Sequence, residues 1–232
     1  MAKTLIIIPA FNEEGSIASV IADIREHAPG ADILVVNDGS KDSTSTIARA
    51  EGVYVLDNPY NLGIGATMQA GYMFAERLGY DIAVQVDGDG QHKASEIGKL
   101  LVPLEKGEAH MVIGSRFLGT GDFKSTAARR VGITLFSKIV SFIIREKFTD
   151  TTSGFRASDR LVIEYFASHY PDDYPEVEAL VLLHKKGFKM AEIGVEMSER
   201  TAGTSSITLI RSVYYMVKVL LAIFVDLIKK VD

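Results

Sequence analysis

Cysteine is absent from the 232-residue sequence, and basic charge is in short supply. Without cysteine the chain can form no disulfide, thiolate metal site or cysteine nucleophile, and its composition suits a reducing compartment. Its 25 lysines and arginines stand against 30 acidic residues, which gives a net charge of −5. Such a protein has no overall basic field to attract nucleic acid, so we expect no nucleic-acid partner.

Long uninterrupted apolar runs are also missing. The opening MAKTLIIIPAFNEE has too short an apolar segment for a signal peptide and then turns acidic, so we expect none. Residues 205–232 are strongly apolar but are broken by Arg211, Lys218 and Asp226. A charge near the centre of a membrane-spanning helix is costly, and Lys218 lies near that centre. We therefore predict an amphipathic helix that lies in the membrane interface or packs on another subunit.

The rest of the sequence alternates between short apolar runs and helical patterns. An apolar content of 47% is enough for a core. The expected strands are TLIIIPA, ADILVVNDGS, VYVLDN, DIAVQVDGDG and AHMVIGSRF, with helices expected over 13–27, 44–50 and 95–104 and in NLGIGATMQAGYMFAERLGY. This alternation predicts an α/β sheet, largely parallel at first and covered on both faces by helices. We expect one catalytic domain over residues 1–204, followed by the C-terminal helix at 205–232.

Polar residues collect where four of these strands end. The four segments are Pro9-Ala10-Phe11-Asn12-Glu13, Asn37-Asp38-Gly39-Ser40, Asp87-Gly88-Asp89 and Gly114-Ser115-Arg116. Open α/β sheets bind ligands at the carboxyl ends of their strands, and the adjoining helix starts favour phosphate. Asp38 is placed to accept hydrogen bonds from a base or a ribose. The pattern predicts a nucleotide-binding cleft.

Asp87 and Asp89 repel each other, so their spacing in VDGDGQH calls for a cation. With Gln91 they offer hard oxygen ligands suited to Mg²⁺ or Mn²⁺, and a diphosphate could complete the octahedron. We expect Asp89 to face solvent in the cleft. His92 either supports the metal motif or is a simple turn residue, and the sequence leaves both readings open.

The motifs in this order resemble the inverting glycosyltransferases of family 2, which have the GT-A fold. PAFNEE, VVNDGSKDST, NLGIGATMQAGY and VQVDGDGQH carry that resemblance. VIGSRF, TDTTSGFRASDR and MSERTAGTSSI are similar to the dolichyl-phosphate mannose synthase-like and bacterial polyprenyl-phosphate subgroup. The likeness spans roughly residues 3–207. It implies transfer of glucose or N-acetylglucosamine from a UDP-sugar to undecaprenyl or another polyprenyl phosphate, for cell-envelope polysaccharide modification.

The resemblance also implies roles for single residues. The donor nucleotide sugar would contact Pro9, Ala10, Asn12, Glu13, Asp38, Gly65, Asp87 and Gly88, and the metal Asp87, Asp89 and Gln91. The acceptor phosphate would face Arg116, Arg129 or Arg130, and Thr134, while Arg200 would clamp the donor diphosphate. Asp89, Arg116, Arg130 and Arg200 form the implied catalytic group. The glycine-containing stretch LGTGDFKSTAA, residues 118–128, has the composition of a loop that closes over the donor.

A lipid phosphate is already anionic at neutral pH, so it can attack the sugar without a strong general base. Glu176 and Glu178 are accordingly interpreted as acceptor-loop or structural residues. A transferase acting on a saccharide hydroxyl would instead need such a base, and this alternative stays open. A sugar nucleotidyltransferase is disfavoured, because the first strand runs into an acidic segment and not into a basic glycine-rich loop. A non-catalytic protein with this fold would be expected to have lost its metal ligands.

Residues 133–148 form a second amphipathic segment, beside the proposed acceptor arginines. Two such helices would hold the enzyme peripherally at the cytoplasmic face of the membrane, within reach of a lipid phosphate. The alternative is that both are buried helices or oligomer interfaces. The sequence leaves open a small membrane-protein partner, a homo-oligomer, and the choice between Mg²⁺ and Mn²⁺.

Overall fold

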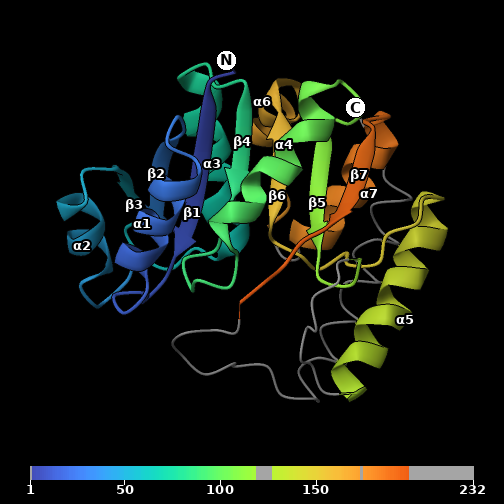
Figure 1. Ribbon diagram of the computed structural model, residues 1–232, viewed down its shortest axis with the longest axis horizontal. Helices are drawn as coiled ribbons and strands as arrows, with labels where there is room; N and C mark the ends of the chain where they lie inside the picture. Colours follow the sequence, from blue (N-terminus) through green and yellow to red (C-terminus); the bar gives the residue numbers. More distant parts are fainter. Residues whose placement is uncertain (1, 119–126, 173–174, 199–232) are drawn as a thin grey trace.

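The computed structural model describes residues 2–118, 127–172 and 175–198 (Figure 1). Side chains of residues 127–135 are not among those described. The predicted C-terminal helix, the proposed boundary after residue 204, Arg200 and most of the predicted closing loop lie outside the described residues.

Seven strands form one sheet within the described part of the chain, in the order β3-β2-β1-β4-β6-β5-β7. The strands are β1 (Thr4–Ala10), β2 (Asp32–Asn37), β3 (Tyr54–Asp57), β4 (Ile82–Gln85), β5 (Met111–Ser115), β6 (Arg156–Asp159) and β7 (Met190–Gly194). The neighbours β1–β2, β2–β3, β1–β4 and β5–β7 pair in parallel, whereas β6 is antiparallel to both β4 and β5. The predicted largely parallel α/β sheet is confirmed.

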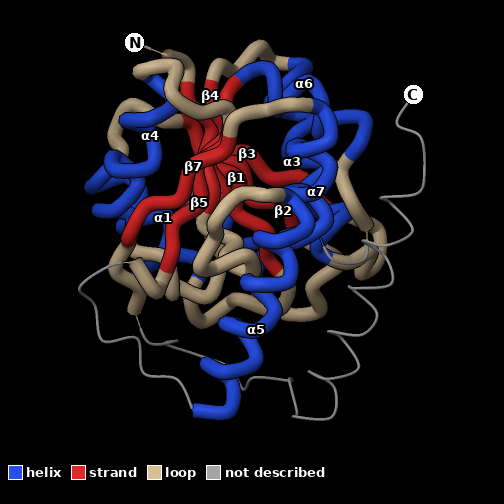
Figure 2. The backbone as a smooth tube through the Cα atoms, turned by 90° about the vertical axis from the view of Figure 1, so that its right-hand side faces the viewer, coloured by secondary structure: helices blue, strands red, loops and turns tan. Residues whose placement is uncertain are grey.

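Helices cover both faces of the sheet (Figure 2). They are α1 (Ile17–His27), α2 (Thr44–Ala50), α3 (Ile64–Arg77), α4 (Ile97–Glu105), α5 (Ala127–Ile144), α6 (Arg160–His169) and α7 (Pro175–Lys186), with a 3₁₀ turn at Ala94–Glu96. Alternate residues of β1 serve the two faces: Leu5 and Ile7 pack with α3, α6 and α7, while Ile6 and Ile8 pack with α1 and α4. This period of two is what a strand buried on both faces requires.

Several features differ from the sequence prediction. Helix α1 begins at Ile17 and not at Glu13, and a turn precedes it, in which the N–H groups of Ser16 and Ile17 donate to the Glu13 carbonyl oxygen. Strands β6 and β7 and helices α6 and α7 were not predicted. Strand β6 is only four residues long and reads RASD, which has no apolar alternation. It pairs with β4, with Arg156 opposite Gln85, and this pairing joins segments that are distant in the sequence.

Candidate functional site

The ends of β1 and β2 are tied together by side chains that cap each other's loops. Asn12 has a positive φ of 56°, its N–H donates to Ser40 Oγ at 2.9 Å, and its Oδ1 accepts from Lys41 N–H at 2.9 Å. The Glu13 N–H donates to Thr44 Oγ1 at 2.8 Å. Asparagine tolerates left-handed backbone better than most residues, so this turn favours it. The structure thus brings two of the four predicted strand ends into one surface.

Asp38 is buried, with 5% of its surface exposed. Its Oδ1 accepts from Leu62 N–H at 2.8 Å and from Asn58 Nδ2 at 3.0 Å, and its Oδ2 accepts from Gly63 N–H at 3.0 Å. The carboxylate therefore fixes the loop that leads from β3 into α3. Its predicted contact with a base or ribose stays a prediction, and its loop-holding role was not predicted from the sequence.

Gly65, predicted to contact the donor, lies in the first turn of α3. A Cβ at this position would come within 2.4 Å of the Pro171 and Asp172 carbonyl oxygens. The need for glycine at residue 65 is therefore explained by the close packing of α3 on the 171–172 backbone. Donor contact by Gly65 stays a prediction.

The Asp87-Gly88-Asp89 turn lies directly against the end of β1. A Cβ at Gly88 would stand 3.2 Å from the Pro9 carbonyl oxygen and 3.6 Å from the Ala10 Cβ. Gly154, just before β6, would with a Cβ come 3.2 Å from Asp87 Oδ1. The structure thus brings together the predicted donor residues Pro9, Ala10, Glu13, Asp87 and Gly88, and it needs small residues to do so.

Asp89 is only 6% exposed, so the expectation that it faces solvent is wrong. Its Oδ1 accepts a hydrogen bond from the Gln91 N–H at 3.0 Å, which folds the carboxylate back over the turn. The Asp87 side chain is more open, at 38% exposure. The two carboxylates therefore share one short turn but differ in their access to solvent.

His92 contacts Asp87 of the predicted metal motif, so it is more than a turn residue. Its Nδ1 accepts from the Asp87 backbone N–H at 3.0 Å, and its Nε2 lies 3.6 Å from Asp87 Oδ2. The ring is 7% exposed and stacks on Phe155, with centroids 4.8 Å apart. In this position His92 would orient Asp87 for the predicted cation.

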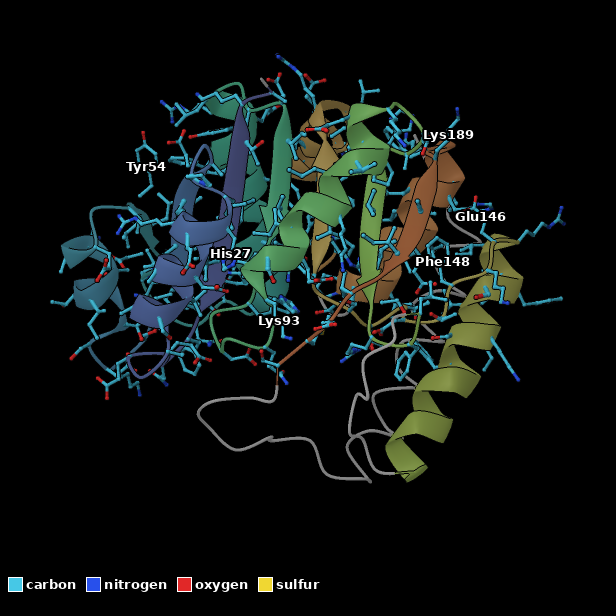
Figure 3. The ribbon with its side chains drawn as sticks, viewed as in Figure 1. His27, Tyr54, Lys93, Glu146, Phe148 and Lys189 are labelled. Carbon is cyan, nitrogen blue, oxygen red and sulfur yellow. The ribbon has the colours of Figure 1, made fainter. Side chains whose placement is uncertain are left out.

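The segment that follows β7 runs alongside the same turn. The Ser198 N–H donates to the Gln91 carbonyl oxygen at 2.9 Å, and His92 pairs with Met197 in an isolated antiparallel bridge. Lys93, which lies at the edge of the sheet where β1 and β4 end, forms an ion pair with Glu196 at 2.9 Å (Figure 3). Gln91, two residues from Asp89, is thereby held by a strand end that is distant in sequence.

The donor set of this turn fits a hard divalent cation. Asp87 and Asp89 supply carboxylates, and Gln91 adds a carboxamide from the same turn. Across residues 2–118, 127–172 and 175–198, no group of three or more histidines and acids is arranged to hold a metal. One or two carboxylates completed by substrate phosphates is the usual arrangement for Mg²⁺ with a nucleotide.

Arg116, at the end of β5, is held by a buried carboxylate. Its Nε and one terminal nitrogen each lie 2.6 Å from an oxygen of Asp150, and the same terminal nitrogen donates to Thr152 Oγ1 at 2.9 Å. Burial lowers the pKa of Arg116, but the bonds and charge of Asp150, with smaller effects of Asp87 and Glu176, leave that pKa raised. The partner Asp150 was not singled out in the sequence.

Sequence reasoning also missed Arg156, which is 2% exposed on β6. Its guanidinium donates to the carbonyl oxygens of Thr151, Ser153 and Glu176. Burial raises the pKa of the Glu176 carboxyl above its ordinary value of 4.5; the charge of Arg156 opposes that rise and the charge of Asp87 adds to it. An arginine in a short polar strand gives no sequence signal of burial, whereas the raised pKa marks Glu176 as a candidate for chemistry.

The remaining predicted acceptor residues lie on α5. Arg129, Arg130 and Thr134 fall in its first half, where only the backbone is described. In its second half, one face packs in the core through Phe136, Val140 and Ile144. Phe142 on the opposite face is 85% exposed. The alternative of a buried helix thus holds for one side of α5. In the described residues, no helix combines the length and apolarity needed to cross a bilayer.

The chain is similar in sequence to several known glycosyltransferases. The chain is 29% identical over 216 residues to a polyprenol monophosphomannose synthase of Mycolicibacterium smegmatis, covering 89% of this chain and 81% of the relative. It is 29% identical over 218 residues to a UDP-N-acetylglucosamine–dolichyl-phosphate N-acetylglucosaminyltransferase of Methanococcus voltae, covering 84% and 86%.

Among solved structures, the fold matches glucosyl-3-phosphoglycerate synthase of Mycobacterium tuberculosis, crystallised with Mn²⁺, UDP and phosphoglyceric acid. The TM-score is 0.73 at 20% identity, covering 97% of this chain and 78% of that one, which supports the predicted GT-A fold. Residues 5–166 match the family described as Glycosyl transferase family 2. The chain therefore belongs to glycosyl transferase family 2 and is a glycosyltransferase.

Proposed function

We propose that the protein is a metal-dependent, inverting glycosyltransferase that moves a sugar from a nucleotide diphosphate sugar to a polyprenyl phosphate. The observation that carries this proposal is the Asp87-Gly88-Asp89 turn packed on the end of β1, with Asp87 braced by His92. Two relatives named for transfer to a lipid phosphate support the acceptor class. Their sugars differ, mannose in one and N-acetylglucosamine in the other. Our donor proposal is a UDP-sugar carrying glucose or N-acetylglucosamine.

The chemistry needs positioning and charge stabilisation more than proton transfer. Asp87, Asp89 and Gln91 would hold the divalent cation, which when bound stabilises the negative charge of the leaving diphosphate. Arg116, oriented by Asp150, would face the attacking phosphate, with Arg130 beside it. In-line attack by that phosphate would invert the configuration of the sugar. Arg200 would meet the donor diphosphate, two residues beyond the contact of Ser198 with Gln91.

We place the enzyme peripherally on the cytoplasmic face of the membrane. Lys138 and Phe142 follow the i, i+4 spacing of one face of α5, Arg145 comes directly after the helix ends, and all three are exposed. An exposed aromatic ring between two cations suits a surface of anionic lipid headgroups.

Asp89→Asn tests the metal assignment. The Asn Oδ1 can still accept from the Gln91 N–H, so the fold should persist while a charged ligand is lost. We expect turnover to fall by a factor on the order of 100 or more. The matched control is Asp81→Asn, at the opposite end of β4, which should keep wild-type activity. Normal Mn²⁺-dependent turnover by Asp89→Asn would overturn the assignment.

A second candidate function is transfer to a saccharide hydroxyl, and the raised pKa of Glu176 favours it. A carboxyl whose pKa lies above its ordinary value is a better general base for a hydroxyl. Glu176→Gln decides between the two acceptors, because a phosphate nucleophile needs no such base. Loss of activity on that substitution, with nucleotide binding intact, would favour the hydroxyl acceptor.

A further inference from the structure

Glu192, on strand β7, holds the chain segment that carries the ion-pair partner of Arg116. We propose that Glu192 is a positioning residue that sets Arg116 for the acceptor phosphate. The inference rests on the proposed function, in which Arg116 faces that phosphate. It assigns to the reaction a carboxylate that the sequence motifs did not single out.

The carboxylate of Glu192 binds two consecutive backbone N–H groups. The Thr149 N–H lies 2.8 Å from Oε2 and 3.0 Å from Oε1, and the Asp150 N–H donates to Oε1 at 2.7 Å. These residues follow Phe148, which lies between β7 and the end of α5 (Figure 3). Hydrogen bonds from backbone N–H groups to a charged acceptor are among the stronger ones in proteins. Glu192 therefore fixes the backbone of Asp150 as Asp150 fixes Arg116.

Two hydroxyl groups also connect Glu192 to the end of β5, where Ser115 and Arg116 lie. An ionised carboxylate can only accept, so the Thr149 hydroxyl, 3.1 Å from Oε1, must be the donor to Glu192. The Ser115 hydroxyl, 2.7 Å from Thr149 Oγ1, then donates to it, and itself accepts from the Phe117 N–H at 3.1 Å. The bonds run in one direction, from Phe117 through Ser115 and Thr149 to Glu192. They fasten both neighbours of Arg116.

Burial and charge explain why the position of the Asp150–Arg116 ion pair depends on Glu192. The Asp150 side chain is fully buried, so its carboxylate depends on Arg116, and its backbone depends on Glu192. Helix α5 joins the same segment, because Ser137 Oγ donates to the Thr149 carbonyl oxygen at 3.1 Å. A shift of Thr149 and Asp150 would therefore displace Arg116 relative to α5, where Arg130 lies in the sequence.

The test is a double-mutant cycle of Glu192→Gln and Arg116→Ala, measured with polyprenyl phosphate as acceptor. We expect Glu192→Gln to raise the KM for polyprenyl phosphate about tenfold, because the carboxamide nitrogen cannot accept the Thr149 N–H bond that Oε2 now accepts, and the negative charge that strengthens the other bonds is lost. Its Kd for UDP or GDP with Mn²⁺ should stay within about twofold of the wild type. In the Arg116→Ala background the same change should add less than about twofold.

Thr149→Val is a second variant, which removes only the hydroxyl link and should raise the same KM about threefold. Glu164→Gln, an exposed acid paired with Arg160, is the matched control and should change neither constant. The inference is overturned if the losses multiply in the double variant, or if nucleotide affinity falls in parallel with acceptor use. A wild-type protein that transfers no sugar to polyprenyl phosphate would instead refute the proposed function, and the inference with it.

Discussion

The Asp87 backbone N–H donates to His92 Nδ1 at 3.0 Å, while His92 Nε2 stands 3.6 Å from the carboxylate of the same aspartate. Because Nδ1 accepts a hydrogen bond, the proton of the neutral ring is on Nε2, which faces Oδ2. Stacking on Phe155 fixes the plane of the ring. His92 therefore holds the backbone of a predicted metal ligand by a hydrogen bond, and its ring lies beside that ligand's carboxylate.

Replacing His92 with alanine should weaken metal binding more than folding. Loss of a residue that orients a metal-binding carboxylate typically costs about 10- to 100-fold in metal affinity. We expect the Mn²⁺ concentration for half-maximal activity to rise by that factor. His27→Ala, on the exposed face of α1, is the control (Figure 3). An unchanged Mn²⁺ requirement in His92→Ala would show that the ring is only a packing residue.

A pair of glycine substitutions tests the packing of α3. Gly65→Ala would place a methyl group 2.4 Å from two backbone carbonyl oxygens, so we expect a loss of about 1–3 kcal/mol in the free energy of unfolding. Gly98→Ala, in α4, meets nothing within 4 Å and should gain about 0.5–1 kcal/mol from helix propensity. Urea unfolding measures both. Equal stability of the two variants would contradict the close contact with Pro171 and Asp172.

Glu176→Gln should change stability in a pH-dependent way. The pKa of this carboxyl is raised in the folded protein, so folding favours its protonated form. The wild type therefore loses stability as pH rises from about 4.5 through the folded pKa, whereas glutamine, which stays neutral, does not. We expect the variant to match the wild type below pH 4 and to be the more stable protein at pH 7. Equal pH dependence of the two melting temperatures would show that the environment does not raise this pKa.

Arg130→Ala should weaken use of the lipid phosphate and spare nucleotide binding. A bidentate arginine contact with phosphate is lost, so we expect the KM for polyprenyl phosphate to rise at least about tenfold. Arg129→Ala, one residue earlier on α5, is the matched variant that fixes the register. A larger effect at residue 129 would move the assignment by one position, and no effect at either residue would remove this part of α5 from the acceptor site.

Phe142→Ser should weaken membrane binding without affecting the fold. The ring is 85% exposed, so its removal leaves no cavity. Burial of a phenylalanine in the interface is worth about 1.5–3 kcal/mol, and we expect about tenfold weaker binding to vesicles containing anionic lipid. Leu161→Ser, at an exposed position of α6, is the control. Unchanged sedimentation with vesicles would exclude this face of α5 as a contact with lipid.

Features that depend on local sequence could be predicted. The strand that ends at Ala10 and the Asp87-Gly88-Asp89 turn are each a single unbroken stretch of sequence. The carboxyl ends of neighbouring parallel strands meet at one edge of a sheet, and the fold places these two segments side by side there. The orientation of Asp38 could not be predicted, because its three hydrogen-bond partners lie 20 or more residues away. The pairing of Arg116 with Asp150 spans 34 residues, and the burial of Arg156 depends on an antiparallel strand of four residues.

The most direct test of the central claim is a transfer assay with every combination of donor and acceptor. The purified protein would receive radiolabelled UDP-glucose, UDP-N-acetylglucosamine or GDP-mannose, with either undecaprenyl phosphate in detergent or a free saccharide as acceptor, and with Mn²⁺ in the presence or absence of EDTA. The account predicts a lipid-linked sugar product from one donor, abolished by EDTA. A sugar transferred only to a saccharide hydroxyl, or lipid-linked product that persists in EDTA, would contradict it.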